Sequence, residues 1–354
     1  FRPYLEVTVK VLYENMDKAM DLIVKTLYTS VLQDQKRLKE IVSESRSKMR
    51  IKMNSSAHSL AAGRALAYIS KESQFTDELI GQSYYEFLSD MEEHFDEKQE
   101  TLIQTMQELI KGICRKENMI LSMTCEKEAF DKFKTIAEGF IEQVTQHETE
   151  AKLEKKLELP KLVPANEGIK TAGQVQFVAL GGDCLKGDLS YTGALKVLKT
   201  IMSYDYLWSN IRVKGGAYGC MCNFLRNGNS YFVSYRDPNL AETINVYKTV
   251  SDYVKDFTID SRDMTKFVLG TISTTDTPLN PCAKGQRDYT CYISKLNEEM
   301  LQKERDSIID CQQEDIRALY KQMESMLSEY VLCVVGNEDK IEEQKALFDK
   351  TFNL

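Results

Sequence analysis

The segment Asn210-Ile-Arg-Val-Lys-Gly-Gly-Ala-Tyr-Gly219 carries the most information in this chain. It closes a predicted helix, turns on Gly215 and Gly216, and enters a predicted strand at Tyr218. Adjacent glycines let the backbone turn sharply and leave room for another molecule to approach. Arg212 lies six positions before Tyr218, so a cation and a phenol flank the turn. The segment therefore predicts a site as well as a helix-to-strand junction.

Downstream of this turn the pattern predicts a β-hairpin. Residues 218–225 and 230–236 read as two strands around Asn227-Gly228, a dipeptide preferred where turn residues need positive φ. Residues 175–180 read as a further strand, and residues 188–210 as a helix capped by Asp188. Asp237-Pro238 is expected to open the next helix, with proline at its first position.

Upstream, one predicted strand is followed by many helices. Residues 5–13 alternate apolar and polar side chains, the mark of a half-buried strand. A second strand is predicted over residues 119–124. Helical periodicity covers residues 16–28, 35–52, 57–71, 77–94, 98–114 and 126–144.

These patterns predict an α+β fold of two tandem domains, each a mostly antiparallel sheet covered by helices. The first domain would span residues 1–148 and the second residues 171–354, joined by a charged, proline-containing linker over residues 149–170. Residues 118–124 and 329–335 are similar strand patterns, each followed by a charged helix, which suggests an internal duplication.

Composition excludes several function classes. At 354 residues with 42% hydrophobic content, the chain is typical of a soluble protein with two globular domains. A net charge of −8 disfavours nucleic acid, which needs clustered cations, and mildly favours basic peptides. No apolar run approaches the ~20 residues that span a bilayer. Because Phe1 is not a methionine, we expect the chain to be part of a longer one.

Cysteine and histidine usage argues against both a disulfide framework and a metal site. The nine cysteines include no C-x-x-C pair, and several lie in apolar stretches, so buried free thiols in a reducing compartment are expected. Cys220 and Cys222 read as small apolar fillers of the core. His94-Phe-Asp-Glu97-Lys98 offers lysine where a second metal ligand would stand, and reads as a solvated helix face. No metal ligand is predicted in this chain.

The turn and several other blocks resemble one peptidase family. Arg212, Tyr218 and the glycines between them resemble an element in the C-terminal half of the M16 zinc metallopeptidases, specifically the presequence-protease-like M16C branch. The similarity continues through further blocks, in order, over nearly the whole chain: residues 36–41, 58–68, 87–90, 234–239, 270–273, 276–279 and 283–285. The first blocks resemble the M16C-associated region and the later ones the last M16 domain, so two M16 (LuxS/metallohydrolase-like) domains are implied.

The resemblance implies a function for the chain. It would be the substrate-binding half of a zinc endopeptidase that degrades unstructured peptides in a closed chamber. Zinc would be held by an H-x-x-E-H motif in a missing N-terminal half, since this chain lacks that motif and alone would be inactive. Tyr218 and Arg212 would assist catalysis and bind substrate, together with Gly215 and Gly216. No membrane partner is implied, and the compartment would be the bacterial cytoplasm or, alternatively, an organelle matrix.

Three other interpretations stay open on the residues alone. Arg212 could stabilise a helix C-terminus while Tyr218 packs as a strand aromatic. The chain could be a non-catalytic M16-like scaffold subunit, although such a subunit has no need of the pair. A metal-binding helical protein using His94 and Glu97 would require a third ligand that the sequence does not offer.

Overall fold

The computed structural model describes residues 2–147 and 158–354 and has the predicted α+β composition. The chain forms two compact units, each assembled from segments far apart in sequence. Unit 1 comprises residues 1–45, 88–158 and 278–296, and unit 2 comprises residues 46–87, 159–277 and 297–354. The sequential division at residues 148 and 171 stays a prediction.

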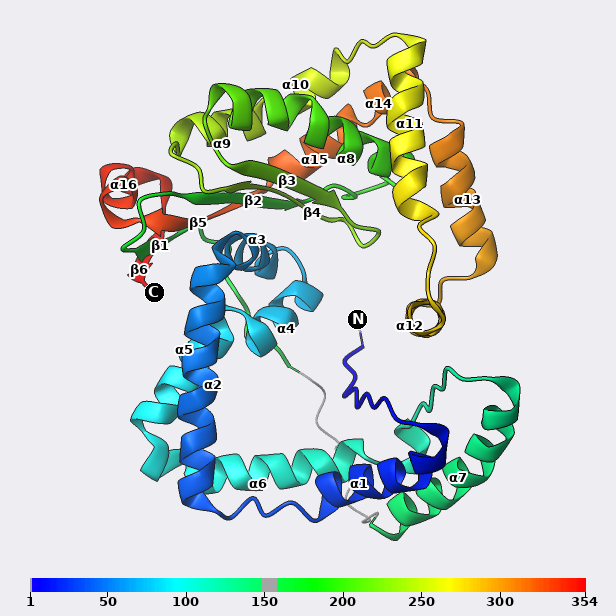
Figure 1. The fold of residues 1–354 in the computed structure, drawn as a ribbon. Coiled ribbons are helices and arrows are strands. Elements are labelled where there is room, and N and C mark those ends of the chain that lie inside the picture. The colour runs from blue at the N-terminus through cyan, green and yellow to red at the C-terminus, as the bar shows by residue number, and fades with distance from the viewer. Residues whose placement is uncertain (1, 148–157) are drawn as a thin grey trace. The chain divides into compact units, whose positions relative to one another are not determined.

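The helices and strands follow one another along the chain as drawn in Figure 1. The α-helices are α1 (Met16–Tyr28), α2 (Gln35–Ser55), α3 (Ala57–Ala67), α4 (Lys71–Ile80), α5 (Gln82–Glu93), α6 (Phe95–Ile113), α7 (Lys127–Gln146), α8 (Ala194–Tyr204), α9 (Ala241–Lys248), α10 (Val250–Lys255), α11 (Ser261–Thr275), α12 (Pro281–Ser294), α13 (Glu298–Ile309), α14 (Gln313–Ala318), α15 (Tyr320–Ser328) and α16 (Glu338–Glu343). The strands are β1 (Glu167–Thr171), β2 (Phe177–Asp183), β3 (Gly219–Phe224), β4 (Asn229–Tyr235), β5 (Val331–Asn337) and β6 (Lys350–Asn353). Short 3-10 helices are η1 (Tyr13–Asn15), η2 (Lys116–Asn118) and η4 (Lys345–Leu347), and η3 (Trp208–Lys214) is a π-helix.

Unit 2 is built on one six-stranded sheet of order β3-β4-β2-β5-β1-β6. Three of the pairings are antiparallel, and β1 pairs in parallel with both β5 and β6. The predicted hairpin is confirmed: β3 and β4 join through Asn227-Gly228, and Gly228 adopts φ +91°. The chain enters the sheet at Gly219, so β3 is an edge strand that begins directly after Tyr218.

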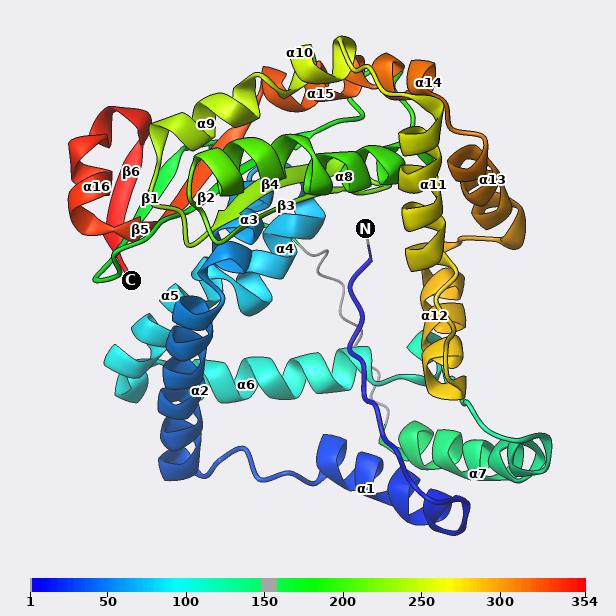
Figure 2. The same ribbon diagram turned by 45° about the horizontal axis from the view of Figure 1, so that its top comes forward.

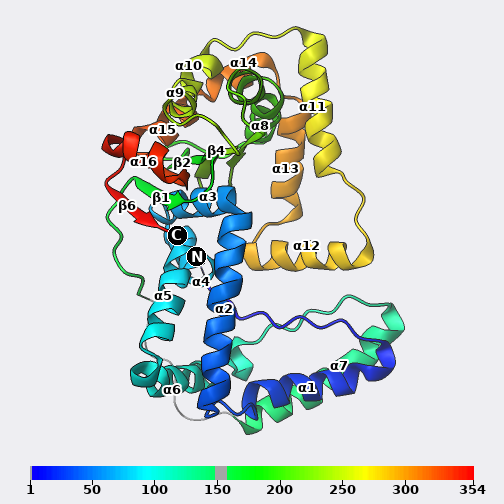
Figure 3. The same ribbon diagram turned by 60° about the vertical axis from the view of Figure 1, so that its left-hand side comes forward.

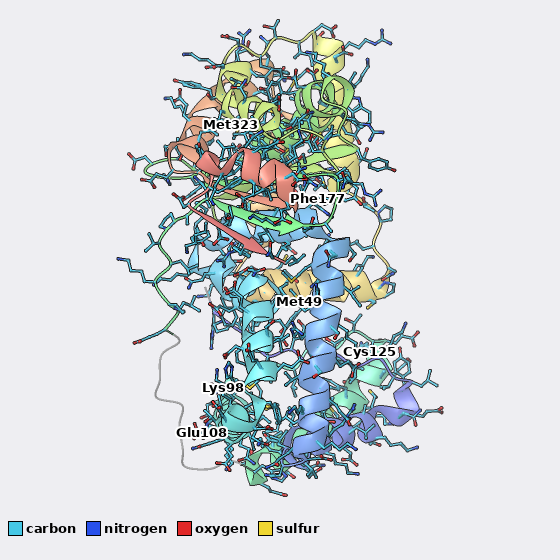
Figure 4. The ribbon with its side chains drawn as sticks, turned by 90° about the vertical axis from the view of Figure 1, so that its left-hand side faces the viewer. Met49, Lys98, Glu108, Cys125, Phe177 and Met323 are labelled. Atoms are coloured by element: carbon cyan, nitrogen blue, oxygen red, sulfur yellow. The ribbon has the colours of Figure 1, made fainter. Side chains whose placement is uncertain are left out.

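Helices cover both faces of this sheet. Helix α3 packs on one face and helices α8, α9 and α15 on the other (Figure 1). Adjacent glycines in β2 permit the close approach, because a Cβ on Gly181 would meet Ala65 of α3, and a Cβ on Gly182 would lie 2.2 Å from the carbonyl oxygen of Met326 in α15. Figure 4 labels Phe177 at the start of β2 and Met323 in α15. The core of unit 2 lies mainly between the sheet and α8, α9, α10 and α15.

A buried ionic network joins α3 to the sheet. Arg64 of α3 donates to both carboxylate oxygens of Glu167 in β1, at 2.6 and 3.0 Å, and to Asp77 of α4 at 2.7 Å. Tyr68 donates its hydroxyl to the same Glu167 carboxylate. Burial alone would lower the pKa of Arg64, but the two carboxylates outweigh it and raise that pKa above its usual value. Arg64 therefore joins α3 to α4 and to the sheet through buried ion pairs.

Every regular element among the described residues of unit 1 is a helix. Helices α1 and α7 lie side by side (Figure 3) and bury Val24, Phe140 and Val144 between them. Tyr28 closes this cluster, since its hydroxyl donates to the Cys114 carbonyl oxygen at 2.8 Å. The small size of the cluster leaves much of each helix surface exposed.

Both strands predicted for unit 1 are wrong. Residues 5–12 and 119–124 form no strand with any of the described residues. The alternation of residues 5–11 is real, but its apolar side chains are exposed; Leu5 is 56% and Val9 48% exposed. Alternating apolar and polar residues form a strand only where a partner strand is available for pairing, and the local sequence contains no information about that partner. Of the two similar patterns that suggested a duplication, residues 118–124 and 329–335, only the second contributes to a strand, β5.

Several predicted boundaries also differ. The helix expected over residues 77–94 breaks at Gly81, where an added Cβ would clash with Asp77. Asp188 lies in a turn, and α8 starts later, after Gly193. Helix α9 begins at Ala241 and not at Pro238, because the Asp237 carboxylate accepts from the Asn239 backbone and from Thr243 instead of capping a helix at Pro238. Strand β1 lies partly inside the range predicted as a linker, whose residues 149–157 lie outside the described residues.

Candidate functional site

The turn between α8 and β3 is wound more widely than a regular helix. Residues Trp208–Lys214 form a π-helix, a rare form that occurs frequently at functional sites. Gly216 adopts φ +79°, which favours glycine, and the Ala217 backbone N–H returns to the Ile211 carbonyl oxygen at 3.1 Å. Asn239 fixes the turn from outside by donating its side-chain N–H to the Gly215 carbonyl oxygen at 2.6 Å. The two glycines therefore serve the turn as predicted.

The Arg212 guanidinium lies between two aromatic rings. It is 4.3 Å from the ring centroid of Trp208, one helical turn earlier, and 5.6 Å from that of Tyr218. Its Nη1 donates to the Tyr218 backbone carbonyl oxygen at 2.5 Å. A guanidinium carries five N–H groups in a rigid fork, and stacking on aromatic rings holds that fork in one orientation. The site thus presents a positioned cation.

The Tyr218 side chain projects from the start of the edge strand. Tyr218 is 65% exposed as a residue, and its ring rests edge-on against Tyr235 of β4, with 5.8 Å between centroids. Tyr235 in turn contacts Phe177 at 5.5 Å and His58 of α3 at 5.0 Å. Burial lowers the pKa of His58, so this histidine is neutral near pH 7 and behaves as an aromatic. These rings support the base of the Tyr218 ring and leave it open to solvent.

Behind the rings, Asp237 fixes the end of β4. Its side chain is fully buried, and it accepts from the Thr243 hydroxyl at 2.7 Å and from the Asn239 backbone N–H at 2.9 Å. Backbone hydrogen bonds in both directions join Asp237 to Gln176, just before β2. Burial raises the pKa of Asp237 above its ordinary value, partly offset by these hydrogen bonds. Arg236 before it adopts φ +50°, so the strand ends at a defined bend.

The donor set of the described residues does not fit a zinc ion. Among residues 2–147 and 158–354, no three or more His, Cys, Asp or Glu side chains gather as metal ligands do. His94 and Lys98 both pair with the exposed Asp90 at the junction of α5 and α6. His147 stacks on the Tyr28 ring at 4.4 Å. No step of a reaction is therefore assigned to a metal held by these residues.

The cysteines of unit 2 behave as core residues. Burial raises the pKa of Cys220 to about 11 and that of Cys222 to about 12, so neither is a thiolate near neutral pH. Cys222 is buried in the main core, as predicted for a small apolar filler.

Sequence reasoning identified the centre of this site but missed its supports. Arg212 and Tyr218 lie together, and Gly215 and Gly216 form the turn between them. The contribution of Trp208 was missed, although it is the only tryptophan of the chain and precedes Arg212 by four positions. Tyr235 was also missed, since its place beside Tyr218 depends on the register of the hairpin.

Two family models match the chain. The model described as "PreP C-terminal domain" matches residues 166–338, and the model described as "Peptidase M16C associated" matches residues 1–91. The first covers all of the site apart from His58, which lies within the second.

Curated relatives match over most of the chain. Protein HypA of Clostridium perfringens is 36% identical over 349 residues, which cover 99% of this chain and 35% of that protein. Presequence protease 1, chloroplastic/mitochondrial, of Arabidopsis thaliana is 27% identical over 310 residues, which cover 87% of this chain and 28% of that protein. The chain spans about a third of the length of the relatives it matches.

Solved structures share the fold. A peptidase M16 inactive domain from Pseudomonas fluorescens superposes with a TM-score of 0.58 at 12% identity and covers 92% of this chain and 75% of that one. Pitrilysin superposes with a TM-score of 0.59 at 10% identity and covers 96% of this chain and 36% of that one. The two family models define the class as peptidase M16. The chain belongs to its M16C branch, in the C-terminal region of the presequence-protease-like members.

The search for membrane-crossing segments gave a negative result for the residues that the structure describes. None of their helices combines the length and apolar character required to cross a bilayer.

Proposed function

We propose that this chain is the peptide-binding C-terminal part of a zinc-dependent endopeptidase whose zinc-bearing part lies elsewhere in the longer polypeptide. In this proposal Arg212 and Tyr218 contact the backbone of an unstructured peptide at the bond to be cleaved. Two findings support this proposal. Several relatives are named presequence proteases, and the family model of the PreP C-terminal domain matches this chain. Unstructured peptides are its proposed substrates, and the remainder of the polypeptide is its proposed partner.

The observation that carries the proposal is the pairing of an exposed phenol with an oriented guanidinium. Tyr218 is largely exposed although three aromatic rings lie behind it, so its hydroxyl is accessible to another molecule. Arg212 is stacked on Trp208 and bonded to the Tyr218 backbone, so the two side chains hold a fixed relation.

The chemistry assigned to the pair is donation of hydrogen bonds to peptide oxygen atoms. As an amide is attacked, its carbonyl oxygen gains negative charge, and a fixed donor at that oxygen lowers the barrier by about 3–4 kcal/mol. Tyr218 supplies one hydroxyl donor there. The remaining N–H groups of Arg212 bind a neighbouring carbonyl oxygen of the extended peptide. Gly216 leaves room for the peptide to approach, since an added Cβ would lie 3.7 Å from Pro238, the nearest side chain.

The proposal is tested by steady-state kinetics of the full-length protein on an unstructured peptide. Tyr218→Phe removes only the hydroxyl and should lower kcat/KM by ~10²-fold or more, mainly through kcat. Arg212→Gln should raise KM as well, since it removes contacts to the peptide backbone. Tyr292→Phe is the matched control, because Tyr292 is 69% exposed, lies in unit 1 and is assigned no role.

Retained activity in Tyr218→Phe would refute the role of the hydroxyl. If the full-length protein cleaves no peptide at all, the scaffold alternative replaces the proposal. Thermal unfolding of each variant, followed by circular dichroism, separates lost chemistry from lost folding.

A further inference from the structure

A second candidate site in unit 2 lies at the far end of strand β3. A cavity of about 560 Å³ opens between α8, α11 and the tip of the β3–β4 hairpin, elements that Figure 2 shows together. We propose that this cavity binds an acidic side chain of an extended peptide that pairs with the free edge of β3. The site would select acidic segments, a preference that neither the overall charge nor the Arg212–Tyr218 pair suggests.

The lining of the cavity is cationic. Among the described residues, its lining includes Lys196, Lys199 and Arg226 and no carboxylate. Lys196 and Arg226 share one carboxylate behind the wall, Glu304, each with an oxygen at 2.5 Å. Three cations against one carboxylate leave two positive charges in excess. Lys199 is exposed and its ammonium donates to Asn223 Oδ1 at 3.0 Å, a neutral partner that an anionic ligand can replace.

Hydroxyl groups also line the cavity, but those of Ser203, Thr274 and Thr275 donate their protons to carbonyl oxygens of their own helices. Thr200 and Ser203 lie on the same face of α8 as the two lysines, because positions 196, 199, 200 and 203 recur at helical spacing. Thr274 and Thr275 of α11 line the opposite wall. The two helices are joined by a hydrogen bond of 2.8 Å between the Thr200 and Thr271 hydroxyls, which fixes the width of the opening. The donors that suit an oxyanion such as a carboxylate are therefore the ammonium and guanidinium groups of the lining.

The adjoining strand edge suits an extended peptide. β3 ends the sheet, so one side of its backbone has no neighbouring strand among the described residues. Successive residues of an edge strand direct their backbone N–H and C=O groups alternately toward the neighbouring strand and away from it. Leu225 directs its groups toward β4, because its N–H donates to the Asn229 carbonyl oxygen. The backbone groups of Cys220, Cys222 and Phe224 therefore face away from β4. A row of outward N–H and C=O groups pairs readily with another extended chain. Because Asn223 and Phe224 line the cavity, a strand paired there would place a side chain in it.

Binding at the cavity requires no hydrolysis, so its test is separate from that of Tyr218. The affinity of a fluorescent peptide of five Glu-Thr repeats for the full-length protein, with a chelator present, should exceed that of the matched Gln-Thr peptide. Lys199→Gln should weaken binding of the acidic peptide about tenfold or more, since it removes one charge-assisted hydrogen bond. Lys199→Arg should retain it. The control is Lys266→Gln, an exposed lysine of α11 outside the cavity lining.

The strand-pairing part has its own test. In an extended Glu-Thr peptide, the N–H groups of the Glu residues lie along one edge and those of the Thr residues along the other. Only one edge can pair with β3. Of two peptides N-methylated on all Glu or on all Thr residues, one should therefore bind about tenfold more weakly than the other. Equal affinity of both would overturn the pairing with β3. Equal affinity of the Glu and Gln peptides, or of Lys199→Gln and the wild type, would overturn the acidic site. Competition by inorganic phosphate at the concentration where the peptide binds would make this a small-anion site and overturn the peptide assignment.

Discussion

Replacing Arg64 with methionine should destabilise unit 2 more than any surface change, because it removes the cation from a buried network. Arg64→Met preserves most of the apolar stem of the side chain and deletes the guanidinium. Arg64 is 7% exposed, and its carboxylate partners Glu167 and Asp77 are 1% and 4% exposed. Water cannot easily replace the lost donors at these depths.

The magnitude follows from the partners that remain. Asp77 keeps three donors, the backbone N–H groups of Gln82 and Ser83 and the Ser83 hydroxyl. Glu167 keeps the Tyr68 hydroxyl alone among the hydrogen bonds that its side chain makes in the described structure. Breaking a buried ion pair by removing one partner costs about 3–5 kcal/mol, because a charge is left uncompensated. We therefore expect a loss of about 3–5 kcal/mol at neutral pH, mostly from Glu167.

Urea unfolding of this chain, followed by Trp208 fluorescence, measures this loss for unit 2 specifically, since the only tryptophan of the chain lies there. Adding Glu167→Gln to Arg64→Met should recover part of the loss, because the uncompensated charge is then gone. The exposed Arg50→Met is the matched control.

A loss below about 1 kcal/mol for Arg64→Met at pH 7 would refute this account of the network. The same conclusion would follow if the double variant were no more stable than the single one.

Three further predictions concern Gly216 of the turn, the carboxylate of Glu304 and the cysteine thiols. Gly216→Ala should lower the free energy of unfolding in urea by about 1–2 kcal/mol, because Gly216 adopts φ +79°. Gly219→Ala is the control and should cost less, since the φ of Gly219 is not positive. Equal losses would refute the claim that Gly216 is required by its positive φ. Burial pushes the pKa of Glu304 up, but hydrogen bonds from its lysine and arginine partners outweigh this and hold it below the usual value. Glu304 therefore stabilises the fold above its ordinary pKa of 4.5, and this stabilisation is lost as the pH falls below that value. Over this acidic range, the measured unfolding free energy of Glu304→Gln should decline less steeply than that of the wild type. In maleimide labelling read by mass spectrometry, exposed Cys282 should react first, while Cys222, with its pKa raised to about 12, should stay unlabelled until unfolding; early labelling of Cys222 would contradict its burial.

Features decided by neighbouring residues could be predicted from the sequence. The hairpin at Asn227-Gly228 and strand β5 were found because turn chemistry and apolar runs are local signals. The centre of the candidate site was found for the same reason, since Arg212 and Tyr218 lie within one short segment.

Features decided by distant residues could not be predicted. The strand expected over residues 5–13 has the right alternation, but pairing depends on a partner elsewhere, and the described residues supply none. Arg64 and Glu167 are 103 positions apart, so their pairing was not visible. The π-helix at Trp208–Lys214 was read as the end of an ordinary helix, because its wider winding leaves apolar spacing nearly unchanged over one turn.

The central claim is that Tyr218 and Arg212 contact the backbone of a bound peptide. A structure of the full-length protein with a non-cleavable peptide measures this most directly, through the distance from the Tyr218 hydroxyl to the nearest peptide carbonyl oxygen. The account predicts a separation of about 2.7–3.1 Å, with Arg212 bonded to an adjacent carbonyl oxygen. A bound peptide whose carbonyl oxygens all lie more than about 6 Å from both side chains, beyond the reach of a hydrogen bond or one bridging water, would contradict it.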